Sequence, residues 1–153
     1  MKNPISLRII FFNICLFLCA YYVGFTFIAA SLDKIIDPLS FSENIRAYEI
    51  SPNWSNNLIA ITLPWIELVC GILLLYGLHR FYFSSSYIID IPNNLIILML
   101  IWFIFMLSIA VYRGLDIDCG CGISEDKTTP LERLIEDIYL LIFSIIIKFR
   151  QRI

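Results

Sequence analysis

Two cysteines one residue apart, Cys119 and Cys121, have the clearest capacity for chemistry in this chain. They lie in the polar loop Asp118-Cys119-Gly120-Cys121-Gly122, between two long apolar segments. Residues i and i+2 of an extended strand lie at a separation that a disulfide can just span, and the ring that closes is small. Gly120 and Gly122 ease the backbone turn that this requires. Because a strained disulfide is readily reduced, the pair fits a redox-active dithiol, with a structural disulfide or two unpaired thiols as alternatives.

Charges around this loop act in both directions. Acidic neighbours disfavour a thiolate and basic neighbours favour one. The acids are Asp116, Asp118, Glu125 and Asp126, and the bases are Arg113 and Lys127.

Glu67 is the second candidate site residue, because it lies inside the apolar segment from Leu58 to Leu78. An ionisable group near the middle of a bilayer is costly and marks a functional site by default. Pro64, three residues earlier, leaves a backbone carbonyl of the same helix without its donor. The alternative is a packing role, in which a protonated Glu67 bonds to Tyr21, Tyr22 or Thr26.

The composition indicates what must position these residues. The chain has 153 residues, of which 59% are hydrophobic and 16% charged, and its mean hydropathy is +0.82. A soluble domain has roughly 45–50% apolar and about 25% charged residues. We therefore predict an all-α integral membrane protein, a four-helix bundle forming a single domain over residues 1–153. The expected transmembrane helices, each near the roughly 20 residues that a bilayer requires, are 9–30, 58–78, 95–112 and 131–149.

The first span is too long for the roughly 7–15-residue core of a signal peptide, so we expect it to be retained. Both chain ends are basic, with Lys2 and Arg8 at one and Lys148, Arg150 and Arg152 at the other. We therefore predict a multi-pass protein of the cell inner membrane with both termini cytoplasmic. The Cys119/Cys121 loop is then periplasmic, where disulfides persist.

The first outer loop, residues 31–57, is expected to contain a short helix. Ser40 and Glu43 have the spacing of a capping box, which predicts a start at Ser40. Phe41, Ile45 and Tyr48 then share one face, so the helix would be amphipathic and cover the outer end of the bundle.

The fourth span has its own start signal. Thr129 fits the N-cap, Pro130 the first helical position and Glu132 the capping box. Farther along, Arg133 and Asp137 are spaced as an i, i+4 pair, which we interpret as interfacial solvation rather than chemistry.

Other polar and sulfur-containing side chains have plain interpretations. Lys34 and Arg113 end the first and third spans and could reach inward. Cys15, Cys19 and Cys70 fit small buried hydrophobes, with an internal thiol relay as the alternative.

Several classes of site are poorly supported. Zn²⁺ needs four ligands, and the single histidine, His79, is expected on the opposite side from the cysteine loop. One histidine cannot supply paired haem ligands within the membrane. A net charge of −2 without a basic tail argues against nucleic-acid binding, and no phosphate-binding or dinucleotide motif is present.

Three motifs together give the chain a family resemblance. They are the outer-loop sequence from Ser31 to Pro38, the second-span sequence from Leu63 to Gly71, and the loop sequence from Arg113 to Gly122. In order and spacing they resemble the MauE/DoxX family of small four-helix membrane proteins, over roughly residues 15 to 147.

The resemblance implies a membrane protein that supports thiol–disulfide redox or maturation of an exported partner, as in methylamine utilisation. In that interpretation Cys119 and Cys121 form the dithiol, Glu67 contributes to a proton or quinone site in the bundle, and Lys34 and Arg113 place positive charge at its mouth. The expected partners are the lipid bilayer and an exported redox or disulfide-containing protein. The resemblance does not identify a definite cofactor, and the family's link to quinone-dependent sulfur oxidation makes a quinone the candidate. Two alternatives remain open: a non-catalytic scaffold with a structural loop disulfide, and a small-molecule carrier that uses Glu67.

Overall fold

The computed structural model describes residues 4–48, 52–81, 87–114 and 129–149. These residues form helices without any strand, as the all-α prediction requires. The helices are α1 (Pro4–Ile36), α2 (Pro38–Ala47), α3 (Asn53–Phe81), α4 (Tyr87–Tyr112) and α5 (Pro130–Phe149).

The long helices are longer than the apolar segments that predicted them. A hydropathy pattern marks only the apolar part of a helix, whereas the helical backbone continues through polar residues until a cap or breaker ends it. In α4 the helix begins at Tyr87 and includes Pro92, whereas the apolar segment was expected from residue 95. A proline so close to the helix start removes only one backbone hydrogen bond, so the helix tolerates it.

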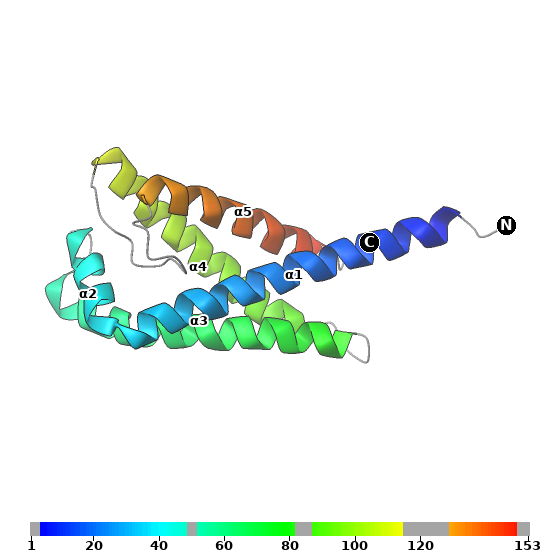
Figure 1. The fold of residues 1–153 in the computed structure, drawn as a ribbon, viewed down its shortest axis with the longest axis horizontal. Coiled ribbons are helices and arrows are strands. Elements are labelled where there is room, and N and C mark those ends of the chain that lie inside the picture. The colour runs from blue at the N-terminus through cyan, green and yellow to red at the C-terminus, as the bar shows by residue number, and fades with distance from the viewer. Residues whose placement is uncertain (1–3, 49–51, 82–86, 115–128, 150–153) are drawn as a thin grey trace.

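Two antiparallel helix pairs and one short helix make up the fold (Figure 1). α1 packs along α3, α4 packs along α5, and the two pairs diverge toward the end where α2 lies. The α1–α3 contact is close because glycines face each other across it. A Cβ on Gly71 would lie 2.9 Å from the Gly24 carbonyl oxygen, so the two backbones approach without side chains between them.

The core runs along the facing sides of the four long helices. α4 and α5 are also joined by a polar contact, because Asn93 Nδ2 donates to the Ser144 carbonyl oxygen at 2.9 Å. Both residues are buried. The buried apolar cluster consists of Ala20, Val23, Phe27, Cys70, Leu74, Leu78, Ile89, Ile96, Leu100, Leu140 and Ile147.

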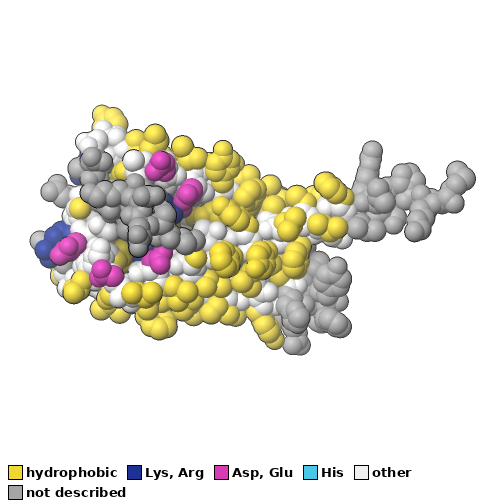
Figure 2. Space-filling view, viewed as in Figure 1, with side chains coloured by type: hydrophobic (Ala, Val, Ile, Leu, Met, Phe, Trp, Pro, Cys, Tyr) yellow, Lys and Arg dark blue, Asp and Glu magenta, His cyan; other side chains and the backbone are white. Residues whose placement is uncertain are grey.

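The surface is that of a protein immersed in lipid over most of its length. Figure 2 shows hydrophobic side chains along the helices and charged ones gathered near the α2 end of the visible face. Three helical segments of the described chain are long and apolar enough to cross a membrane: Phe11–Ile36, Trp54–Leu78 and Ile89–Arg113. They correspond to the first three predicted spans. The fourth, α5, forms a helix as expected but carries four charged residues in its first two turns, so its crossing stays a prediction.

The short helix α2 exists but begins before the predicted Ser40. Asp37 is the N-cap, and its side chain accepts a hydrogen bond from Ser40 N at 3.1 Å. Pro38 follows as the first helical residue, where the missing N–H has no intrahelical partner to lose. The Asp-Pro sequence is therefore the start signal, and the Ser40/Glu43 spacing is not.

The predicted start of α5 is confirmed. Thr129 N donates to Glu132 Oε2 at 3.0 Å, and Glu132 N donates to Thr129 Oγ1 at 3.4 Å. This reciprocal pair is a capping box, with Pro130 at the first helical position.

Candidate functional site

A buried ion pair between Lys34 and Glu67 lies at the centre of the candidate site. Lys34 Nζ lies 2.7 Å from Glu67 Oε1 and 2.8 Å from Oε2, so it donates to both carboxylate oxygens. The two side chains are only 6% and 2% exposed. Charges in such surroundings persist only when paired and hydrogen-bonded, and this pair meets both conditions.

Local sequence explains how the two residues meet. Lys34 lies in the last turn of α1, where the helix dipole favours a cation. Glu67 follows Pro64 in α3, within the close α1–α3 contact that brings the helices together. Two aromatic rings complete the surroundings of the ammonium, because Lys34 Nζ lies 5.2 Å from the ring centroids of Phe41 and Phe103. One lysine thus touches α2, α3 and α4.

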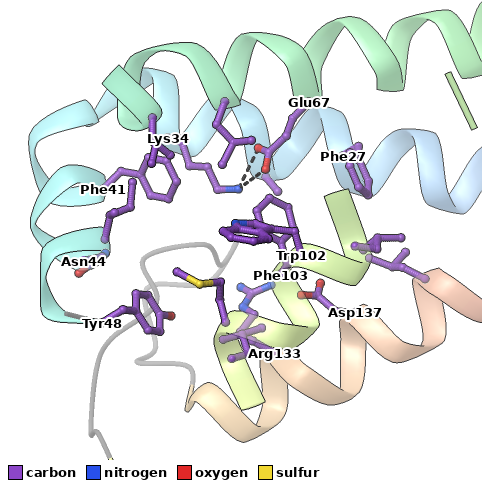
Figure 3. Close-up of a pocket in the computed structure, with 18 of the residues that line it drawn as sticks. Phe27, Lys34, Phe41, Asn44, Tyr48, Glu67, Trp102, Phe103, Arg133 and Asp137 are labelled. Atoms are coloured by element: carbon purple, nitrogen blue, oxygen red, sulfur yellow. Dashed lines mark hydrogen bonds and ion pairs between the residues drawn. The ribbon is translucent and has the colours of Figure 1, made fainter. Parts of the chain in front are cut away.

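The ion pair forms part of the wall of a cavity of about 360 Å³. All five helices contribute to it, and Figure 3 shows Lys34 and Glu67 facing Arg133 and Asp137 across the space. The volume falls within the roughly 300–1,000 Å³ of small-molecule sites. Most residues that line the cavity are apolar or aromatic: Phe27, Ala30, Phe41, Ile45, Tyr48, Pro52, Ile59, Leu63, Leu100, Trp102, Phe103, Met106, Leu107 and Leu140. The polar residues of the lining are Thr26, Lys34, Asn44, Glu67, Arg133 and Asp137.

Arg133 and Asp137 were interpreted from the sequence as solvated charges, yet both line the cavity. The signal that identifies them is helical periodicity. Leu140, Ser144 and Ile147 are the buried face of α5, and stepping back by three and seven residues from Leu140 reaches Asp137 and Arg133.

The charge pairs of α5 differ from the expected one. Arg133 Nη1 donates to Glu136 Oε2 at 2.8 Å, an i, i+3 contact in which Glu136 is the exposed partner. Asp137 is not the partner in that bond. Within the described part of the chain, the Asp137 carboxyl has neither a hydrogen bond nor an ion pair within 4.0 Å.

Glu67 has a different partner from those considered in the packing alternative. It bonds to Lys34 and not to Tyr21, Tyr22 or Thr26. Thr26 Oγ1 instead donates to the Tyr22 carbonyl oxygen at 2.9 Å, while Tyr21 and Tyr22 lie on the outer surface. The sequence therefore identified Glu67 as unusual, and the structure supplies its counter-charge.

The other predicted residues differ in where they lie relative to the cavity. Arg113 lies at the end of α4, where its Nη1 donates to the Tyr48 carbonyl oxygen at 3.4 Å, and it does not line the cavity. Phe41, Ile45 and Tyr48, predicted to share one face of the short helix, all line the cavity. Cys119 and Cys121 lie outside the described residues.

The three remaining cysteines are free thiols at different depths. Cys70 is buried in the apolar core, Cys19 packs against that core, and Cys15 is exposed on the outer side of α1. Cys70 and Cys19 thus have the predicted surroundings of small hydrophobic residues, whereas Cys15 is exposed and the prediction of burial is wrong for it. The described residues hold no group of three or more His, Cys, Asp or Glu side chains placed to bind a metal ion.

The fold and the site define an all-helical membrane protein whose helices enclose a cavity around a buried ion pair. The model of one family, methylamine utilisation protein MauE, matches residues 12–150 of the chain. The chain therefore belongs to the MauE family, although this match does not extend to the DoxX part of the resemblance. Neither the curated proteins nor the solved structures contain a match.

Proposed function

We propose that this chain is an accessory membrane protein that supports thiol–disulfide redox or maturation of an exported partner protein. The observation that carries the proposal is the MauE match over residues 12–150, which includes Cys119 and Cys121. Methylamine utilisation is the setting that the family description names. The partner in this chain's own case is a protein with a disulfide or dithiol to exchange.

The helices on either side of the cysteine loop support this role. α4 ends at Tyr112, and the guanidinium of the next residue, Arg113, donates to the Tyr48 carbonyl oxygen. The Thr129 capping box precedes α5, which begins at Pro130. The loop is therefore tied at both ends to the part of the molecule that contains the cavity. Fixed flanking helices of this kind favour a site at which a partner can be presented.

For the topology, we propose that α5 is the fourth crossing of an inner-membrane four-helix bundle. Both termini are then cytoplasmic and the Cys119/Cys121 loop is periplasmic. The basic ends of the chain and the even number of crossings support this arrangement.

The proposed chemistry is thiol–disulfide exchange. The thiolate of one loop cysteine attacks a partner disulfide, forms a mixed disulfide and releases one partner thiolate. The second loop cysteine then attacks the mixed disulfide, which releases the partner with two reduced cysteines and leaves Cys119 and Cys121 joined. The reverse sequence oxidises the partner, and two electrons with two protons then pass from the loop dithiol to an acceptor such as a quinone.

Trapping in intact cells tests this proposal. A Cys121→Ser chain retains the attacking Cys119 thiol but cannot resolve a mixed disulfide, so a covalent adduct should accumulate that disappears on reduction. Cys15→Ser is the matched control, because that thiol is exposed on the outside of α1 and has no assigned role. The proposal fails if neither Cys119→Ser nor Cys121→Ser traps a partner and the double variant retains full function.

The cavity favours a second candidate function, a small-molecule carrier that uses Glu67. Its support is the volume around the ion pair and the depth of Glu67 within a span. A Glu67→Gln chain that loses function while its loop cysteines still cycle between thiol and disulfide would favour the carrier. Loss of cycling in the same variant would favour the redox role.

A further inference from the structure

We propose that the cavity is a binding site for an uncharged, lipid-soluble ring compound that bears carbonyl or hydroxyl groups. Its head would lie between the Lys34–Glu67 pair and Asp137. This inference deepens the proposed function and rests on it for the class of acceptor, because it gives such an acceptor a site in the cavity. Its observations use no residue of the cysteine loop, so the two can be tested separately.

The walls of the cavity fit a flat apolar body. Phe41, Tyr48, Trp102 and Phe103 contribute aromatic rings from α2 and α4, and most other lining residues are aliphatic. Rings of this kind pack against a planar ligand by stacking or edge contacts. A volume of about 360 Å³ suits a small bicyclic molecule better than a whole phospholipid.

Trp102 indicates the direction of access. It lines the cavity, and the residue is 56% exposed. It also lies near the middle of the candidate span Ile89–Arg113. An opening of the cavity beside this exposed ring would face the acyl chains of the bilayer, so a lipid-soluble molecule could reach the cavity without passing through water.

The charges of the cavity argue for an uncharged ligand. Lys34 and Glu67 neutralise each other almost without exposure to solvent, and Arg133 is bonded to Glu136. The remaining carboxyl, Asp137, adds no charge in its protonated form, which apolar surroundings favour. A ligand with its own net charge would disturb this balance in surroundings that screen charge poorly. A neutral head with oxygen substituents is compatible with it, because a ligand carbonyl accepts from a protonated carboxyl and a ligand hydroxyl also donates to a carboxyl oxygen.

Asp137 is the polar group that such a head would meet. It faces the cavity from α5, and among the described residues its carboxyl has no hydrogen bond. A polar side chain in an apolar wall is stabilised when a partner occupies its hydrogen-bonding capacity. In its protonated form, which an apolar wall favours over an unpaired charge, the Asp137 carboxyl donates to a carbonyl or hydroxyl oxygen of the ligand, which makes Asp137 a specificity-determining residue.

Tryptophan fluorescence of the detergent-solubilised full chain provides the test. The sequence has three tryptophans, and Trp54 and Trp65 are exposed and do not line the cavity. A Trp54→Phe/Trp65→Phe chain therefore reports on Trp102 alone. The probe is 1,4-naphthoquinone, a neutral quenching ring with two carbonyls, and the matched probe is its charged 2-sulfonate.

Quenching of the Trp102 fluorescence should reach a plateau as the concentration of the neutral probe rises. With the sulfonate, quenching should only increase in proportion to its concentration. In the same background, Asp137→Leu makes the wall more apolar, so non-specific partitioning would strengthen quenching. Loss of a hydrogen bond to the head should instead weaken binding by about five- to tenfold. Ala30→Phe, which places a ring in the cavity, should abolish saturation, whereas Leu32→Phe on the exposed side of α1 should leave it unchanged.

Three outcomes would overturn the proposal: no saturation with the neutral probe, equal saturation with the sulfonate, or binding that Asp137→Leu leaves equal or tighter. The comparison of the two probes needs no cavity substitution, so the test stands even if Ala30→Phe does not fold. A negative result here leaves the cysteine trapping experiment untouched, and failure of trapping leaves this one untouched.

Discussion

The two sides of the cavity contain the same interaction in opposite surroundings. On the α1–α3 side, Lys34 pairs with Glu67 at 2.7 Å, with the side chains 6% and 2% exposed. On the α5 side, Arg133 pairs with Glu136 at 2.8 Å, with the side chains 16% and 53% exposed. The two ion pairs therefore have nearly the same N–O distance and differ in how far their side chains are buried.

The difference determines what each pair contributes. An exposed pair gains little, because water and salt screen it and long side chains lose freedom when they form it. A buried pair must be kept whole, since removing one partner leaves an uncompensated charge in an apolar place. We therefore expect the α1–α3 side to be sensitive to substitution and the α5 side to be tolerant.

The largest expected effect is that of Glu67→Gln. The substitution leaves the Lys34 ammonium buried without its counter-charge, which should lower the free energy of unfolding by about 3–5 kcal/mol. The measurement is unfolding by SDS titration in mixed micelles, followed by helical circular dichroism.

A Lys34→Met/Glu67→Leu chain is the control, because it removes both charges and keeps similar volumes. It should recover most of the stability that the single change loses. If the Glu67→Gln chain unfolds at the same SDS concentration as the parent chain, the ion pair is not a main determinant of stability. The contrast between the two sides of the cavity is then wrong.

A smaller effect is expected where α1 meets α3. In Gly71→Ala the new Cβ would lie 2.9 Å from the Gly24 carbonyl oxygen, a backbone atom that cannot rotate away. Overpacking of this kind lowers stability by about 1–3 kcal/mol. The same SDS titration measures it.

Gly24→Ala is the matched substitution on the facing helix. Its Cβ would meet Leu75 side-chain atoms at 2.8 Å, and a flexible side chain can move. Gly24→Ala should therefore be the milder of the two changes. The reverse order would show that the helices separate more easily than their close contact suggests.

On the α5 side, Thr129→Ala should have a moderate effect. It removes the hydroxyl that accepts from Glu132 N and so breaks one half of the capping box. Loss of an N-cap residue lowers stability by about 1 kcal/mol. The hydrogen-exchange rate of the first-turn amides of α5 should rise, while the rates of the α3 amides should not change. An equal rise in both helices would contradict a local role.

The smallest expected effect is that of Glu136→Gln. The carboxyl is more than half exposed, so loss of its bond to Arg133 should change the free energy of unfolding by less than about 0.5 kcal/mol. Any small loss should vanish at high salt, because screening weakens an exposed pair. A loss as large as that of Glu67→Gln would erase the distinction between the two sides.

Sequence reasoning identified the elements well because their signals are local. Apolar stretches predicted the three candidate spans, and the Thr129-Pro130-Leu131-Glu132 sequence predicted the start of α5. Where two local signals competed, as at Asp37-Pro38 and Ser40, the wrong one was chosen. Helix ends were missed because hydropathy follows the apolar core and not the helical backbone.

The site was only partly predictable because its key contact is not local. Glu67 is conspicuous as a carboxyl in an apolar segment, but its partner Lys34 lies 33 residues away on another helix. Lys34 was expected at the mouth of the site and not in a buried pair. Which face of α5 turns inward depends on its packing against α1 and α4, so Asp137 was assigned to the solvated side.

The length of α1 has a consequence for how the protein can be probed. At roughly 1.5 Å per residue, its 33 residues extend about 50 Å, well beyond the roughly 30 Å of a bilayer's hydrocarbon core. Tilting alone rarely absorbs such an excess, so the helix must project from the membrane. Pro4 lies about 45 Å along the helix from Lys34. An affinity tag or fluorophore joined to the amino terminus would therefore report which face of a vesicle the protein presents without approaching the cavity.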